Sequence, residues 1–472
     1  GNVQQVQQLL NNNSNINFFY QNSSNQTSFW IACSNGHIEI VKLLLNDERV
    51  EVNQANKSGW TPFNNVCEKG YIEIVKLLLN DQRVDINKPN RYQRETPFYI
   101  VCKKGHIEIV KLLLNDDRVD VNKTSKTDGE TPFYRACYQG DSEIAKLLLE
   151  DERVDINKMN HYWRTPFKIA CEKGHTEIVK LFLNDSRVDI QAHKDGWTPF
   201  HVSCEKGHIE TVKLLLNDRI VDINEEDKFQ RTPLYIACSK GQIEIVKLLL
   251  NDDRVDVNKT ERMFGETPFH VSFYQGYIGI LKLFLNDSRV DINKEDNYGR
   301  TPFHRACENG HTDAVKLLLN DDRVDVNQTN REGATPFWVA CSNGHIDIAK
   351  LLIVSEKGVT LSDEALINME RIRKEINRKG WEREEQFQLR LKNSKIIVEL
   401  LESFKRSPTE TRFKWRLQLG FIGKQFHFFF FFQFYFILFY FILFQFFIDA
   451  EAASIFSTIV LLSDHYFRFK KE

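Results

Sequence analysis

The chain has 472 residues, which is enough for several compact domains because single hydrophobic cores usually stop growing well before this length. Its 63 basic and 65 acidic residues give a net charge of −2, so no global positive field is present to gather nucleic acid. The same balance excludes the acidic excess typical of disordered chains. Internal organisation therefore decides the number of cores, and partners must be recognised by local surfaces.

The first residues are polar, and they show no charged start followed by an apolar stretch, so no signal segment is predicted there. Within them, Gly1-Asn2-Val3 through Leu9-Leu10 matches the second half of the repeating unit that follows. We therefore expect residues 1–25 to be a partial N-terminal repeat.

A Thr-Pro-apolar triplet then recurs with a period of 33 to 35 residues, which is typical of repeat architectures. An earlier copy reads Thr27-Ser28-Phe29, with Ser in the Pro position. The period predicts an array of ten repeats over residues 26–353. The threonines of the full triplets are Thr61, Thr96, Thr131, Thr165, Thr198, Thr232, Thr267, Thr301 and Thr335.

Each unit predicts a pair of helices. Thr supplies an N-cap oxygen and Pro is tolerated at the first helical position, so the first helix begins at the triplet and ends at a Gly such as Gly36. The second helix carries a broad apolar face, with Glu39 and Lys42 on its solvent side. The joining segment, for example Val119 to Asn122, has the alternation of extended chain and predicts a β-hairpin loop.

This unit resembles the ankyrin repeat, whose pattern is Thr-Pro-Leu-His, a small residue, Gly-His, an apolar helix and Asp-Val-Asn. Phe replaces Leu in nearly every copy, and Leu234 is the exception. The segment Asn115 to Arg118 departs from the Gly-Ala turn that is usual in the family. The resemblance implies an all-α ankyrin solenoid of helix-turn-helix units joined by β-hairpin loops. His follows the triplet at His201, His270 and His304.

After the array, Ser362 to Lys379 and Glu382 to Phe404 have helical spacing and are broken by Gly380 and Pro408. We expect residues 354–420 to form C-terminal helices that cover the apolar end of the stack, as solenoids require of their terminal units.

The apolar run Phe426 to Ile448 has the length of a membrane-spanning helix. Basic residues cluster before it, which favours a single anchor with the repeats on the cytoplasmic side. The alternative is that the tract derives from an intron, since thirteen of its residues are Phe and Gly423-Lys424 can be encoded by a splice-donor-like sequence. Residues 449–472 form a short tail.

All nine cysteines occupy one position of the repeat, and Phe273 takes that place in the remaining copy. In-phase spacing predicts buried packing in a reducing cytoplasm and no redox or metal chemistry. His follows four residues later in six copies, but each Cys-His pair would need further ligands from elsewhere, so neither a metal site nor a cofactor is predicted. The cysteines are Cys33, Cys67, Cys102, Cys137, Cys171, Cys204, Cys238, Cys307 and Cys341.

No phosphate-binding loop, nucleophile elbow or zinc-protease motif is present, so the sequence predicts no enzyme activity. The resemblance implies instead a concave protein-binding face lined by loop tips and first helices. The positions there vary between copies, and Trp, Tyr and Arg are the side chains most enriched at interface hot spots. The predicted partner contacts, each with hairpin packing or simple solvation as its alternative, are Trp60, Tyr138, Arg164, Trp197, Arg231, Tyr274 and Arg300.

These features together predict a cytoplasmic, non-catalytic scaffold or adaptor that binds other proteins and no nucleic acid. Two alternatives are an ankyrin protein anchored to a membrane through Phe426 to Ile448, and the ankyrin portion of a larger enzyme or channel.

Overall fold

A computed structural model describes residues 2–12, 21–190, 196–355 and 357, together with single residues between 392 and 415. Contacts divide the chain into two compact units, residues 1–334 and 335–472. In the described part, the first unit holds a short N-terminal helix, α1 (Val3–Asn12), and nine helix pairs, and the second unit holds a tenth pair. The helix pairs follow one another with the period of the predicted repeats.

The first helix of each pair begins at the Thr-Pro triplet. The Thr hydroxyl oxygen accepts a hydrogen bond from the N–H three residues on, as Thr96 does from Tyr99 at 3.2 Å, which satisfies a donor that the helix leaves unpaired. The first helices are α2 (Ser28–Ser34), α4 (Pro62–Lys69), α6 (Pro97–Lys104), α8 (Pro132–Gln139), α10 (Pro166–Lys173), α12 (Pro199–Lys206), α14 (Pro233–Ser239), α16 (Pro268–Val271), α18 (Pro302–Asn309) and α20 (Pro336–Ser342).

The second helices bury one apolar face and expose the other. In α5, Ile74, Val75 and Leu78 are buried, whereas Lys76 pairs with Glu73 at 2.7 Å on the solvent side. The second helices are α3 (Ile38–Leu45), α5 (Ile72–Leu79), α7 (Ile107–Leu114), α9 (Ser142–Glu150), α11 (Thr176–Leu183), α13 (Ile209–Asn217), α15 (Ile243–Leu250), α17 (Ile278–Leu285), α19 (Thr312–Leu319) and α21 (Ile346–Val354).

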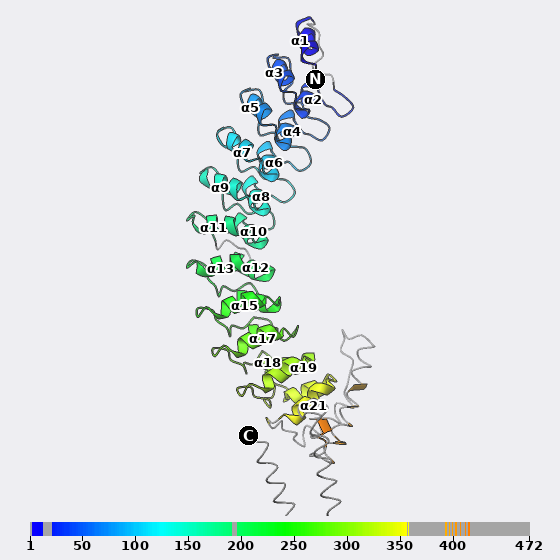
Figure 1. The fold of residues 1–472 in the computed structure, drawn as a ribbon, viewed down its shortest axis with the longest axis vertical. Coiled ribbons are helices and arrows are strands. Elements are labelled where there is room, and N and C mark those ends of the chain that lie inside the picture. Colours follow the sequence, from blue (N-terminus) through cyan, green and yellow to red (C-terminus); the bar gives the residue numbers. More distant parts are fainter. Residues whose placement is uncertain are drawn as a thin grey trace, which may run out of the picture. The chain divides into compact units, whose positions relative to one another are not determined.

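The core is continuous from pair to pair in the first unit because each first helix packs on the next first helix and each second helix on the next second helix. Figure 1 shows these rows for α3 to α11, with the loops projecting beyond the first helices. The triplet Phe and the repeated Cys fill the space between rows, and residues such as Phe98 and Cys102 are at most 1% exposed. All nine cysteines are buried, and burial raises the pKa of thiols such as Cys102. This confirms their packing role.

Phe273, the one departure from Cys, changes its helix. The ring is fully buried and lies 5.1 Å from the ring of Phe269. α16 ends at Val271, and the N–H groups of Phe273 and Tyr274 bond three residues back to His270 and Val271 instead of four. The bulkier side chain therefore accompanies a tighter last turn.

No strand occurs among the described residues, so the β-hairpin form predicted for the loops is not shown. Backbone bonds close the loop tips, such as the 3.0 Å bond from the Asn90 N–H to the Glu95 carbonyl, and side chains bond the segment after each second helix. The Asp of each Asp-x-Arg segment accepts from the N–H of the Arg two residues on, and Arg118 also pairs with Asp116 through its guanidinium at 2.6 Å. The same guanidinium donates to the carbonyl of Leu79 in the preceding repeat at 2.7 Å. The segment that departs from the family pattern thus joins neighbouring repeats.

Gly ends most first helices in the left-handed conformation, as predicted. Gly105 and Gly140 occupy the same position in successive repeats, with φ of 74° and 86°. A Cβ on Gly105 would meet Asp141 at an ordinary 3.6 Å, whereas one on Gly140 would lie 2.6 Å from the His175 ring. His175 is fixed there by a 3.1 Å hydrogen bond between its Nε2 and the carbonyl of Tyr138.

We expect Gly140→Ala to destabilise the array more than Gly105→Ala. The Gly105 change introduces only left-handed strain, about 1 kcal/mol, whereas the Gly140 change also displaces His175 from its hydrogen bond, for a total of roughly 2–3 kcal/mol. Urea unfolding of both variants, followed by circular dichroism, measures the difference. Equal losses would contradict the role given to His175.

Three predictions fall on the C-terminal region. The helices expected within residues 354–420 lie almost entirely outside the described residues, as do the Phe426 to Ile448 tract and the 449–472 tail. They remain predictions. Among the helices that the structure describes, none is long and apolar enough to cross a membrane.

Candidate functional site

The seven predicted contact residues lie at two positions of the repeat, and all of them are at least partly exposed. Tyr138 and Tyr274 stand at the end of a first helix. The other five directly precede the Thr of a triplet, at the base of a loop tip, and are Trp60, Arg164, Trp197, Arg231 and Arg300.

The backbone at the loop tips is fixed from two sides. An Asn or Asp side chain accepts from the N–H of the residue before Thr, as Asp227 does from Arg231 at 2.9 Å. The carbonyl of that residue accepts from a side chain of the preceding first helix, as Arg231 does from His201 at 2.8 Å and Trp197 does from Lys168 at 2.5 Å. The chain therefore holds these residues in place while their side chains differ between copies.

Two of the histidines that hold the loop tips, His270 and His304, are neutral at pH 7. The Thr267 N–H donates to His270 Nδ1 at 3.2 Å, so the ring carries its proton on Nε2 and donates to the Arg300 carbonyl at 3.1 Å. Burial lowers the pKa of His270 to about 4, with Asp296 opposing and Arg305 and Arg300 reinforcing the shift. Burial also lowers the pKa of His304.

We expect the stability of the array to fall below pH 6.5. The unfolded chain binds a proton on His270 near its ordinary pKa of about 6.5, whereas the folded chain binds it only near 4. The contribution of the neutral histidine to the free energy of unfolding is therefore complete above pH 6.5. It is lost as the pH falls toward 4, by at most about 1.4 kcal/mol per pH unit for each histidine. Thermal unfolding between pH 7 and pH 4 measures this.

The matched control is His270→Asn, because the repeat that starts at Thr61 carries Asn64 at this position. Asn64 accepts from the Thr61 N–H at 3.0 Å and donates to the Lys88 carbonyl at 3.1 Å, without a titratable group. The variant should show a shallower loss of stability between pH 6.5 and pH 4. Parallel curves for both proteins would exclude His270 as the cause.

Three of the seven predicted contacts come together in one groove. Arg164, Trp197 and Arg231 lie around a hollow of about 440 Å³ formed by three successive loop tips and by α10 and α12. We call this hollow the central groove. Its other lining residues are Tyr162, Trp163, Lys168, Glu172, Val202, Glu205, Lys206, Asp227, Lys228 and Phe229.

Tyr274 and Arg300 instead belong to an internal ion network. The Tyr274 hydroxyl donates to Glu266 at 2.8 Å, and Arg300 donates to the buried Asp296 at 2.9 Å. Arg305 pairs with both carboxylates, and its side chain is 7% exposed. Burial raises the pKa of Glu266. Both side chains are therefore bonded within the array, and their part in partner binding remains a prediction.

Trp60 and Tyr138 lie apart from the central groove. The carbonyl of Trp60 accepts from the Trp30 indole N–H at 2.9 Å, so this residue, too, is held through its backbone. The Tyr138 ring lies 4.7 Å from the Arg135 guanidinium carbon and 4.5 Å from the Lys173 ammonium, in cation–π contact with both.

Sequence reasoning missed Trp163. This residue is 52% exposed and has a φ of 59°, a left-handed conformation that a bulky side chain rarely adopts. The same loop position holds Gly in six of the nine Thr-Pro units, and the other exceptions are Arg94 and Gln230. A Trp where most copies carry Gly was the available signal. The Tyr162 and Phe229 rings, also exposed, stand beside it in the central groove.

The histidines four residues after Cys serve the stack. His106, His208 and His311 each bond through Nε2 to a carbonyl near the end of the preceding first helix, at 2.9 to 3.2 Å. In the part of the chain that the structure describes, no three His, Cys, Asp or Glu side chains are grouped so that they could hold a metal ion.

Comparison with protein families matches the family model of ankyrin repeats in three copies, five times along the chain, over residues 1–90, 82–160, 152–227, 219–296 and 278–364. A comparison with curated protein sequences finds no match. The matched ranges cover the helix pairs and their loops without interruption. The chain belongs to the ankyrin-repeat family.

Proposed function

We propose that this protein is a non-catalytic scaffold that binds other proteins through its loop tips and first helices. Ankyrin repeats are in general protein–protein interaction modules. The observation that carries the proposal is the contrast at the residue before each Thr. Its carbonyl accepts a hydrogen bond from the preceding first helix where the side chain is Trp, at Trp60 and Trp197, where it is Arg, at Arg231 and Arg300, and where it is Ala, at Ala334.

Such a surface suits recognition because its order is established before binding. Association carries an entropic penalty for each loop and side chain that becomes ordered on binding. A loop tip that is already ordered avoids this penalty, so more of the free energy of its contacts goes into affinity. The hydrogen bonds to both sides of the tip backbone come from the repeat scaffold and are independent of a partner.

Site-specific photo-crosslinking tests the scaffold proposal. A photoreactive phenylalanine analogue at Trp60 or Trp197 should crosslink to other proteins in a lysate, whereas the same group at Glu73 or Lys76, on the exposed side of α5, should give at least tenfold less product. Equal yields from both faces would overturn the proposal.

We place this scaffold in the cytoplasm, where nine buried thiols suit a reducing environment. The alternative is action at a membrane surface, and it depends on the apolar tract Phe426 to Ile448. Fractionation of the full chain separates these cases, because an anchored protein pellets with membranes and resists extraction by high salt.

A further inference from the structure

The central groove has a layered charge distribution. Five basic and three acidic residues line it, and each acid pairs with a base of the groove: Glu172 with Arg164, Glu205 with Lys206 and Asp227 with Arg231. The carboxylate side chains are 2–24% exposed, whereas their basic partners are 31–45% exposed. The acids therefore hold the bases in place from below, and the surface that meets solvent is cationic.

Aromatic rings stand between these cations. The Arg231 guanidinium carbon lies 5.5 Å from the Trp197 ring and 4.9 Å from the Phe229 ring. The guanidinium is therefore in cation–π contact with both rings. Trp163 adds an exposed indole from a left-handed backbone that favours Gly. Strain of this kind persists where the surrounding structure holds it, and it concentrates at functional positions.

From this arrangement we infer that the central groove binds an extended acidic peptide segment that also carries aromatic or aliphatic side chains. Carboxylates of the segment meet Arg164, Lys206, Lys228 and Arg231, and apolar side chains pack on Trp163 and Phe229. Guanidinium and ammonium groups over aromatic rings select carboxylates and apolar groups together. The inference rests on the proposed scaffold function and names the partner chemistry of one site.

Selection from a library of random 12-residue peptides, displayed and panned against the full chain, provides the probe. The selected pool should be enriched in Asp and Glu next to Phe, Trp or Leu. Binding of the selected peptides should weaken at least tenfold in Lys206→Glu/Lys228→Glu and also as salt rises. The control Lys57→Glu/Lys104→Glu changes the charge equally at other repeats and should leave the affinity within twofold.

Trp163→Gly separates a binding role from a structural role. If Trp163 serves binding, affinity falls at least tenfold while the unfolding midpoint stays equal or rises, because Gly relieves the left-handed strain. Arg94→Gly relieves the same strain in another loop and should leave binding unchanged. A clear fall in the unfolding midpoint of Trp163→Gly would assign the indole to packing.

Two results would overturn the peptide inference: a selected pool without acidic enrichment, or peptides whose affinity the charge reversal leaves unchanged. Peptides that bind elsewhere on the loop tips would remove only this site and leave the scaffold proposal standing. Crosslinking that does not distinguish the loop-tip face from α5 would instead remove the scaffold proposal.

An independent observation concerns the contact between repeat 5, which starts at Thr165, and repeat 6, which starts at Thr198. Elsewhere the Arg of the Asp-x-Arg segment donates to the Leu carbonyl near the end of the preceding second helix, at 2.5 to 2.8 Å. These bonds are charge-assisted and stronger than neutral ones. The donors are Arg83, Arg118, Arg153, Arg187, Arg254, Arg289 and Arg323.

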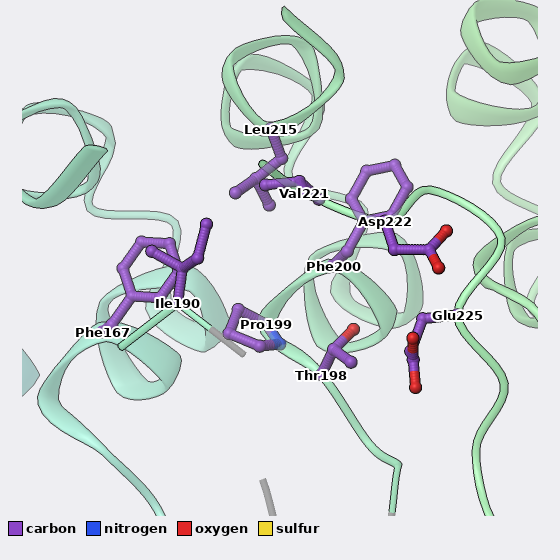
Figure 2. Close-up of a pocket in the computed structure, with 9 residues that line it drawn as sticks. All are labelled: Phe167, Ile190, Thr198, Pro199, Phe200, Leu215, Val221, Asp222 and Glu225. Atoms are coloured by element: carbon purple, nitrogen blue, oxygen red, sulfur yellow. The ribbon is translucent and has the colours of Figure 1, made fainter. Parts of the chain in front are cut away.

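Repeat 6 reverses this pair of residues and reads Asp218-Arg219-Ile220. The Ile220 N–H still donates to Asp218 at 2.8 Å, so the turn is kept, but the side chain has no donor to offer the Leu183 carbonyl and is 67% exposed. At the same contact a small gap of about 20 Å³ lies between the two repeats. Figure 2 shows Phe167 and Ile190 on one side of the gap and Leu215 and Val221 on the other.

Ile220 therefore cannot supply the charge-assisted bond that the Arg side chains supply at the other contacts, while α10 and α12, which form the floor of the central groove, pack directly on each other.

Discussion

The structure depends on hydrogen bonds that cross from one repeat to the next. A single helix pair cannot bury its apolar faces alone, and it leaves carbonyl groups unpaired at its helix ends and loop tips. Side chains of the adjacent repeat reach these carbonyls: an Arg bonds near the end of the second helix, a His near the end of the first, and a third side chain at the loop tip. Each repeat therefore needs the same neighbour to bury its apolar faces and to form hydrogen bonds with its unpaired carbonyl groups.

Because the bonds between repeats at the loop tips use backbone groups, the side chains on this surface can vary while the fold stays the same. The backbone bonds at the loop tips involve carbonyl and N–H groups, so they do not depend on which side chain stands before Thr. The side chain itself is often bonded within its own loop, as Arg300 is to Asp296 and Arg231 to Asp227. Around the central groove, carboxylates that are little exposed hold basic side chains that are more exposed to solvent.

Local signals predicted the helices well. Thr-Pro and Gly fix where the first helix begins and ends through capping and the left-handed conformation, both of which act within a few residues. The in-phase cysteines were correctly expected to be buried. The loops were predicted less well: alternating Val-Asp-Val-Asn residues indicated strands, but Asp and Asn side chains bond the backbone there and replace a strand ladder.

By itself, the sequence determined the repeat length, the helix pairs, the family and the face on which variable residues lie, because these depend on short-range capping and on a regular period. Only the tertiary structure decided which variable residues share a site. Arg164, Trp197 and Arg231 meet in the central groove because stacking brings successive loop tips together, whereas Arg300 and Tyr274 lie in an ion network that Arg305 joins from the next repeat. The same holds for the exposed Trp163 and for Ile220, which stands where other repeats carry an Arg that bonds to the preceding repeat. Their roles depend on neighbours in repeats that are roughly thirty-four residues apart in the sequence.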